Sequence, residues 1–131
     1  MANMNIIYKE MEYCKEMQLG DILAEGDYKN IKYYIISYGT HPCCYLGIPE
    51  NHHLYAVKYE NIKFNCHGGL TYSGFLSHSN PNVNTSYWYI GWDYAHCLDK
   101  IGLCPFGEKW TTNKLINEIR GTIDENLGLL L

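Results

Sequence analysis

The chain has little positive charge and a single arginine. Only 18% of its 131 residues are charged, and ten Lys and Arg stand against fourteen Asp and Glu, which gives a net charge of −4. Surfaces that bind nucleic acids need clustered basic residues. No such cluster is present in the sequence, so duplex DNA and RNA are not expected partners. A small anionic ligand remains possible, because it needs only a few hydrogen-bond donors.

Long apolar runs are also missing. The longest unbroken run is a few residues, whereas a membrane-spanning helix needs roughly 20. The first 16 residues interleave charged and apolar side chains and contain no apolar core of a signal peptide. We therefore expect no membrane segment. A length of 131 residues with 47% hydrophobic side chains predicts one globular domain over residues 1–131.

The six cysteines contain no Cys-x-x-Cys pair. Cys43 and Cys44 are adjacent, and adjacent side chains diverge in a strand, so a structural zinc site is not expected. Without a secretory context, reduced thiols are the default prediction. The P-loop, Gly-x-Gly-x-x-Gly, His-Glu-x-x-His and Gly-x-Ser-x-Gly motifs are all absent from the sequence. We predict no bound cofactor and no resident metal.

Tyrosine is unusually abundant, with thirteen copies, and aromatic residues reach 15%. A tyrosine has a large apolar ring and a polar tip, which suits both strands and ligand pockets. Alternation and β-rich composition predict strands at residues 22–24, 31–38, 43–48, 62–66 and 87–92, and extended structure at 70–73. Helical spacing predicts helices at residues 11–19 and 110–127, the second beginning at Thr111 or Thr112. The predicted class is α+β, with a small antiparallel or mixed sheet and a C-terminal helix packed on one face.

Unusual polar residues gather in three stretches at or just past predicted strand ends. These are residues 40–43 together with 51–53, residues 65–73, and residues 91–99. Small proteins often place their sites in such loops.

The second stretch contains His67 followed by Gly68 and Gly69. Two glycines allow positive φ angles, so successive backbone N–H groups could line an anion-binding concavity. A tight turn or bulge fits the same two residues equally well. Three hydroxyl-bearing residues follow on alternating faces, namely Thr71, Tyr72 and Ser73.

The third stretch contains Asp93, His96 and Asp99 at a spacing of three. Such a set could orient an imidazole for acid–base work, hold a divalent metal, or form a structural network. A metal shell would need His41, His52 or His67 to complete it. We favour recognition of a polar ligand. Neither Cys66 nor Cys97 is expected to act as a nucleophile, because each is next to its histidine in sequence.

At these stretches the sequence resembles a widespread family of small phage and prophage proteins. The family pattern contains HxCGYVxIPxxHPLY, VHGGLTYS and WxIGFDCAHxxD. The counterparts here are HPCCYLGIP with HHLY, then CHGGLTYS, then WYIGWDYAHCLD, within residues 40–99. The chain departs from the pattern at Cys44, His53, Trp92 and Tyr94. These changes alter the walls of a pocket more than its polar residues.

The resemblance implies an accessory role against host defence, in the cytoplasm of an infected bacterium. One reading is a sponge that sequesters, without turnover, a nucleotide-derived immune signal such as an ADP-ribose derivative made by a TIR-domain enzyme, as in Thoeris-type defence. A diphosphate would contact the amides of Gly68 and Gly69, and ribose hydroxyls would bind Asp93 or Asp99. A flat ring would lie against an aromatic side chain, such as Trp88, Trp92, Tyr72 or Tyr94. The predicted ligand-binding residues are His41, His52, His67, Gly68, Gly69, Thr71, Tyr72, Ser73, Trp88, Trp92, Asp93, His96 and Asp99.

Two other functions stay open from the sequence. A small hydrolase acting on a nucleotide-like substrate would use His67 or His96 as base, with Asp93 as its orienting partner. A protein-binding inhibitor would instead present an exposed apolar patch. A homo-oligomer is also possible, because the apolar tail at residues 127–131 could pack against a second copy.

Overall fold

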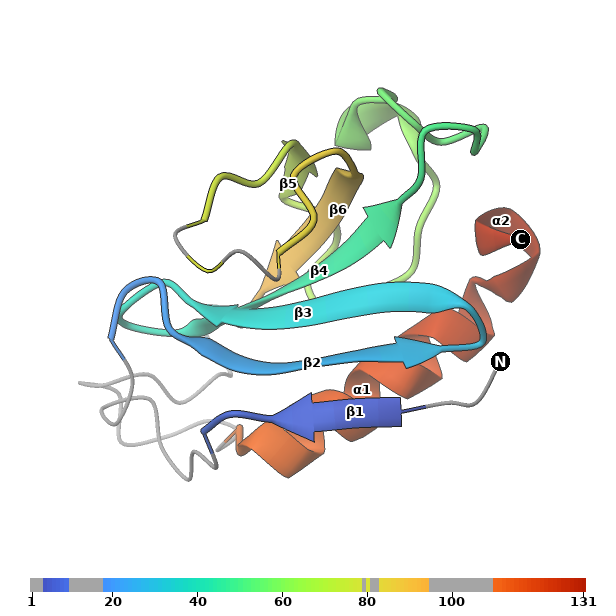
Figure 1. Cartoon of the computed structure of the whole chain (residues 1–131). Coiled ribbons are helices and arrows are strands. Elements are labelled where there is room, and N and C mark those ends of the chain that lie inside the picture. Colours follow the sequence, from blue (N-terminus) through green and yellow to red (C-terminus); the bar gives the residue numbers. More distant parts are fainter. Residues whose placement is uncertain (1–3, 10–17, 79, 81–82, 95–109) are drawn as a thin grey trace.

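The computed structural model describes residues 4–9, 18–78, 80, 83–94 and 110–131. His96, Asp99, Cys97 and most of the helix predicted at residues 11–19 lie outside the described residues. Six strands form one sheet in the order β1-β2-β3-β4-β6-β5, and every neighbouring pair is antiparallel (Figure 1). The strands are β1 (Met4–Ile7), β2 (Ile22–Tyr28), β3 (Ile31–Ser37), β4 (Pro42–Ile48), β5 (Tyr72–Gly74) and β6 (Trp88–Asp93). The predicted α+β class is confirmed.

The helices follow the sheet at the C-terminus. They are α1 (Thr112–Glu125) and the short α2 (Leu127–Leu130), and a 3-10 turn, η2, lies at Tyr59–Asn61. Thr111 caps α1, because its side chain accepts a hydrogen bond from the Lys114 backbone N–H. α1 packs behind β2 and β3, as Figure 1 shows. Within the described ranges, neither helix has the length and apolar composition that a membrane span requires.

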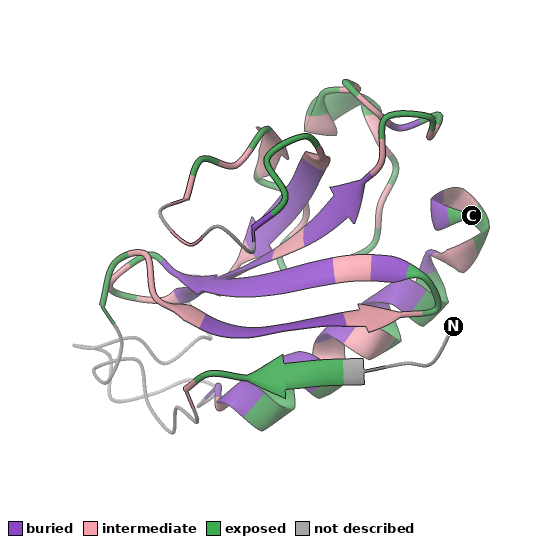
Figure 2. Cartoon of the chain, in the orientation of Figure 1, coloured by how far each residue is buried: buried purple, intermediate pink, exposed green. Residues whose placement is uncertain are grey.

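The sheet has two differently covered faces. The face toward α1 carries the main hydrophobic core, to which β3 contributes Tyr33 and Ile35 and β4 contributes Cys44 and Leu46. The opposite face carries a smaller cluster that contains Tyr34, Ile36, Val83 and Tyr89. Figure 2 shows that β2, β3, β4 and β6 are mostly buried, whereas the edge strand β1 is exposed. Each central strand therefore has two sets of side chains with different surroundings.

Strand β2 is longer than the sequence predicted. Residues 25–27 resemble a turn, but they are part of the strand, and the hairpin turn lies at Lys29 and Asn30, with φ angles of 51° and 66°. Consecutive positive φ angles are typical of the two-residue turns that join antiparallel strands. Glu25 is buried within the strand because Lys32 and the Tyr8 hydroxyl both donate hydrogen bonds to its carboxylate. This tertiary pairing overrides the local turn signal.

The strand predicted at residues 62–66 does not form. Burial alternates there as predicted, with Ile62, Phe64 and Cys66 half-buried, but the segment pairs with no strand. Its backbone is held by a side chain instead: the Asn65 N–H donates to Asn126 Oδ1 at 3.0 Å, and Asn126 Nδ2 donates to the Asn65 carbonyl at 2.7 Å. The segment is thereby fastened to the end of α1.

Gly91 of β6 is one of the closely packed glycines of the sheet. It lies directly opposite Tyr45 of β4 on one side and Tyr72 of β5 on the other. A Cβ atom at this position would lie 2.7 Å from the Tyr45 ring and 2.9 Å from the Cys44 carbonyl oxygen. The close approach of the three strands therefore requires a residue without a side chain.

We expect Gly91→Ala to lower the free energy of unfolding by about 1–3 kcal/mol, because the added methyl overpacks the sheet. The matched control is Gly121→Ala in α1, where nothing lies within 4 Å of the new Cβ. That change should raise stability by about 1 kcal/mol, the helix-propensity difference between the two residues. Urea denaturation of both variants measures this, and equal effects in the two would contradict the packing argument.

Candidate functional site

Parts of the three polar stretches meet at one end of the sheet. The β3–β4 turn is closed by a hydrogen bond from the Tyr38 N–H to the His41 carbonyl, and the Tyr94 N–H donates to the Pro42 carbonyl. The Thr71 N–H donates to the Gly91 carbonyl at 2.9 Å, which holds the segment before β5 against β6. Residues that are as far apart in the sequence as Pro42 and Tyr94 thus become neighbours through the pairing of β4, β5 and β6.

A hollow of about 440 Å³ lies at this end, and we call it the tyrosine hollow. It opens on the face opposite α1, because the side chains of Cys43 and Tyr45 alternate with those of Cys44 and Leu46, which belong to the main core. Its lining residues come from all three polar stretches and from the strands that carry them: Tyr38, His41, Cys43, Tyr45, Thr71, Tyr72 and Asp93.

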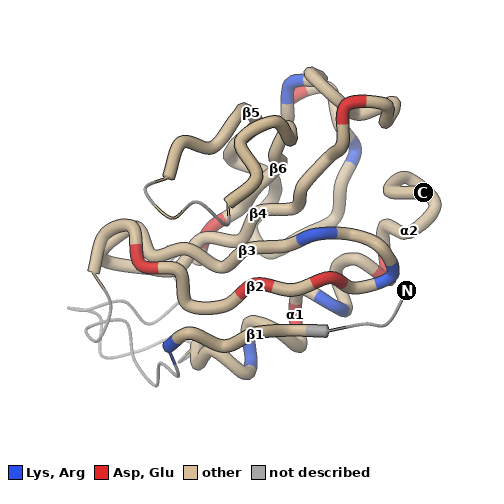
Figure 3. Tube along the Cα trace, viewed as in Figure 1, with Lys and Arg blue, Asp and Glu red and all other residues tan. Residues whose placement is uncertain are grey.

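Asp93 supplies a fixed carboxylate to the tyrosine hollow. It is the last residue of β6 and is paired in register with Cys43. The Thr71 hydroxyl donates a hydrogen bond to Asp93 Oδ2 at 3.2 Å. None of the described residues that line this hollow is a lysine or arginine. Figure 3 shows acidic and basic residues spread over the described chain without a basic cluster at this end.

Aromatic rings form most of the walls. The Tyr45 and Tyr72 rings meet edge to face, with centroids 5.5 Å apart and planes at 89°. The Tyr72 hydroxyl donates to the Phe75 carbonyl at 2.5 Å, which fixes its ring. Tyr38 lies beside His41 with centroids 5.3 Å apart. The hollow thus combines flat apolar surfaces with one carboxylate, an imidazole and a hydroxyl.

The thiol in the tyrosine hollow is protonated at neutral pH. Burial and the negative charge of Asp93 raise the pKa of Cys43 to about 11, and burial raises the pKa of the Cys44 thiol on the other face as well. Nucleophilic cysteines need a lowered pKa. Cys43 therefore serves as a small apolar lining residue.

Gly69 lines a different cavity, which we call the glycine groove, and Gly68 is not among the residues that line either cavity. This open groove of about 740 Å³ lies between residues 64–69 and the face of α1 that carries Glu118, Gly121, Thr122 and Glu125. Gly68 and Gly69 have φ angles of 70° and 85°. The Gly69 N–H donates to the Cys66 carbonyl at 3.1 Å, so this amide closes a tight turn, the structural alternative that the sequence left open.

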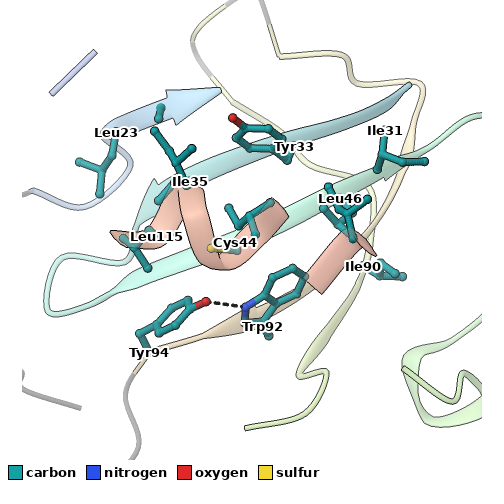
Figure 4. Close-up of a cluster of buried hydrophobic side chains, with 14 of the residues drawn as sticks. Leu23, Ile31, Tyr33, Ile35, Cys44, Leu46, Ile90, Trp92, Tyr94 and Leu115 are labelled. Atoms are coloured by element: carbon teal, nitrogen blue, oxygen red, sulfur yellow. Dashed lines mark hydrogen bonds between the residues drawn. The ribbon is translucent and has the colours of Figure 1, made fainter. Parts of the chain in front are cut away.

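A buried hydrogen-bond relay leads from the core to the glycine groove. Trp92 Nε1 donates to the Tyr94 hydroxyl at 2.9 Å, as Figure 4 shows, and the Tyr94 hydroxyl donates to the Glu118 carboxylate. Burial, the nearby Cys44 and the Glu118 carboxylate raise the pKa of Tyr94 far above its ordinary value. The His67 ring stacks on Tyr94 with centroids 4.5 Å apart. The relay fixes Glu118 while leaving it half-buried at the groove.

The structure divides the predicted site residues. His41, Thr71, Tyr72 and Asp93 line the tyrosine hollow, whereas His67 and Gly69 line the glycine groove on the other face. The other described members have structural contacts. Trp92 is buried in the core, Trp88 Nε1 donates to the Val57 carbonyl, and the Ser73 hydroxyl accepts from the Tyr59 N–H.

His52 lies in a clamp on the C-terminal helix. Its Nδ1 accepts the Leu54 N–H at 3.0 Å, so the proton is on Nε2, which donates to the Leu130 carbonyl at 2.8 Å. His78, which the sequence analysis did not select, has the same arrangement. Its Nδ1 accepts the Asn80 N–H, and its Nε2 donates to the Gly20 carbonyl at 2.7 Å.

Three residues of the tyrosine hollow were missed from the sequence: Tyr38, Cys43 and Tyr45. Residues 43 and 45 alternate in a predicted strand, but nothing local shows which face meets Asp93. Among the described residues, no group of three or more His, Cys, Asp or Glu side chains is close enough to hold a metal ion.

Comparisons with known proteins identify no relative. No family model matches the chain, and neither a curated protein nor a solved structure matches it.

We expect Tyr94→Phe to lower the free energy of unfolding by about 1–3 kcal/mol, because it leaves the buried Trp92 N–H without an acceptor. Urea denaturation measures the loss. Tyr59→Phe, which removes a hydroxyl from a half-buried tyrosine outside the main core, is the control and should change stability little. A similar loss in both variants would mean that the relay adds nothing specific.

Alkylation of Cys43 should report its raised pKa. In the native protein its reaction rate with iodoacetamide should keep rising from pH 9 to about 11, because the thiolate fraction keeps growing over that range. In urea the rate should level off above pH 9, the ordinary thiol value. Peptide mapping by mass spectrometry assigns the modified cysteine. A native rate that levels off above pH 9, as it does in urea, would show that Asp93 and burial do not act on this thiol.

Proposed function

We propose that this chain binds a small nucleotide-derived ligand in the tyrosine hollow and holds it without chemical change. The observation that carries the proposal is the shared lining of that hollow. His41 comes from the first polar stretch, Thr71 and Tyr72 come from the second, and Asp93 comes from the third. These stretches are the ones on which the resemblance to phage accessory proteins depends.

The lining suits such a ligand. Ligand sites are concave, have volumes of roughly 300–1,000 Å³, and combine apolar walls with a few placed polar groups. The rings of Tyr45 and Tyr72 offer apolar surface to a base. The Asp93 carboxylate can accept hydrogen bonds from ribose hydroxyls, a role that acidic residues have in dinucleotide-binding folds.

Binding without turnover fits the groups in the hollow better than hydrolysis. Covalent catalysis needs an activated nucleophile, and the one thiol in the described lining has a raised pKa. The Asp93 carboxylate accepts a hydrogen bond from the Thr71 hydroxyl, which helps to set its position before a ligand enters. A preorganised pocket of this kind favours tight binding, because little ordering is needed when the ligand enters.

The setting follows from the resemblance. We propose that the chain acts in an infected bacterium as a sponge for a nucleotide-derived immune signal of the ADP-ribose type. Sequestration of this kind requires only that the ligand be held intact, and the tyrosine hollow supplies contacts for its ring and its hydroxyls.

We expect ADP-ribose to bind the purified chain in isothermal titration calorimetry, and Asp93→Asn to weaken binding by about tenfold or more, since a hydrogen bond to a charged group is lost. The control is Asp27→Asn, which changes another half-buried strand aspartate, located near the β2–β3 turn at the other end of the sheet. Heat release followed by mass spectrometry should recover intact ADP-ribose.

Three results would contradict the proposal. Recovery of cleaved ADP-ribose would identify a hydrolase. Absence of binding to ADP-ribose and to the related nucleosides would remove the ligand class and favour the protein-binding inhibitor. A normal affinity in Asp93→Asn would place the site elsewhere.

A further inference from the structure

We infer that the tyrosine hollow admits the uncharged nucleoside end of its ligand and leaves the phosphate groups outside. This inference rests on the proposed function and specifies which part of a nucleotide-derived molecule the hollow recognises. The observation behind it is the juxtaposition of the Asp93 carboxylate with the Tyr38, Tyr45 and Tyr72 rings in one hollow.

The negative charge of Asp93 disfavours a phosphate in the tyrosine hollow. Asp93 is half-buried and lies within the hollow, where its negative charge acts on the neighbouring Cys43. A phosphate placed beside it would bring two negative charges together in a partly desolvated space, which is unfavourable. A phosphate therefore needs a cation in the same space to offset Asp93.

The described cations at the sheet have other positions and partners. Lys32 forms an ion pair with Glu25 at 2.7 Å, and Lys29 forms one with Asp124 at 2.5 Å. The third cation, Arg120, donates a hydrogen bond from Nη2 to Asn5 Oδ1 at 2.8 Å. None of the three lines the tyrosine hollow. In the part of the chain that the structure describes, the hollow is therefore lined by no lysine or arginine that would offset a phosphate.

As a hydrogen-bond acceptor, Asp93 favours a sugar. An ionised carboxylate only accepts hydrogen bonds, as Asp93 does from the Thr71 hydroxyl. The two neighbouring hydroxyls of a ribose are donors that match a carboxylate, whereas a phosphate offers only acceptors at neutral pH. Asp93 thus selects a donor-bearing sugar in preference to an anion.

The rings of Tyr38 and His41 lie at the rim of the tyrosine hollow. The Tyr38 side chain is 63% exposed, although it is large and apolar, and its ring lies next to that of His41. A base that stacks on these two rings would remove apolar surface from water. The rim therefore favours a flat ring, while the Asp93 end favours the sugar attached to it.

Titration calorimetry with adenosine, AMP and 2′,3′-dideoxyadenosine tests the inference. Adenosine should bind at least as tightly as AMP, because the phosphate gains no partner in the hollow. Dideoxyadenosine should bind about tenfold or more weakly, because it has lost the donors to Asp93. In Asp93→Asn, adenosine should lose affinity and its advantage over AMP should shrink, whereas Asp27→Asn should match the wild type.

The outcomes separate this inference from the proposed function. If AMP binds about tenfold more tightly than adenosine, the nucleoside-end inference is overturned while binding of a nucleotide-derived ligand stands. If adenosine and dideoxyadenosine bind equally, the sugar is not what Asp93 recognises. If adenosine, AMP and ADP-ribose all fail to bind, the proposed function fails and this inference falls with it.

Discussion

The tyrosine hollow depends on one close approach between three strands. Gly91 lies in register with Tyr45 on one side and Tyr72 on the other, and it has no side chain to separate them. The two rings therefore meet over Gly91, edge to face. Asp93, two residues further along β6, lies on the same face and completes the hollow. A side chain at position 91 would move the ring of Tyr45, and the site residues from the other strands would lose their common geometry.

The two faces of the sheet carry polar groups in different surroundings. On the α1 face, polar groups are tied to the core, since the Trp92–Tyr94–Glu118 relay joins β6 to the helix through buried hydrogen bonds. On the opposite face, a carboxylate and several phenol rings surround open space. Buried networks of this type need every member to be satisfied, which makes the relay a structural feature first. The polar groups of the hollow face open space and are not buried in the core, so the hollow is the better place for a ligand.

Much of the fold follows from patterns in the sequence. The strands near residues 31–38, 43–48 and 87–92 and the C-terminal helix were predicted with small errors at their ends, because β-branched and aromatic residues alternate in the strands and apolar residues recur at helical spacing in α1. The length of β2 could not be predicted, because a buried Glu25 is stable only through Lys32 and Tyr8, which are separate in the sequence. Apolar and polar residues alternate at 62–66 as they would in a strand, but the backbone of this segment is hydrogen-bonded to the side chain of Asn126.

The site was harder to predict than the fold. The polar stretches were correctly identified as neighbours of strand ends, but their assignment to one cavity ignored the two faces of a strand. Trp92 and Asp93 are consecutive in β6 and must point to opposite faces, so they do not share the hollow. By the same rule, the side chains of Cys43 and Tyr45, two residues apart in β4, point to the same face. Which of these faces meets Asp93 depends on the register between β4 and β6, and the sequence contains no local signal for it.

The paired histidine clamps bear on how the connecting loops are kept in place. His52 and His78 each join a loop to a distant backbone carbonyl, one toward the C-terminus and one toward the turn before β2. In both, Nδ1 accepts a backbone N–H from the histidine's own loop and Nε2 bonds to the distant carbonyl, so both ring nitrogens are used. Each ring thus fixes the shape of its loop and the place of that loop against the rest of the molecule at the same time. A single side chain does in each loop what would otherwise need two separate contacts.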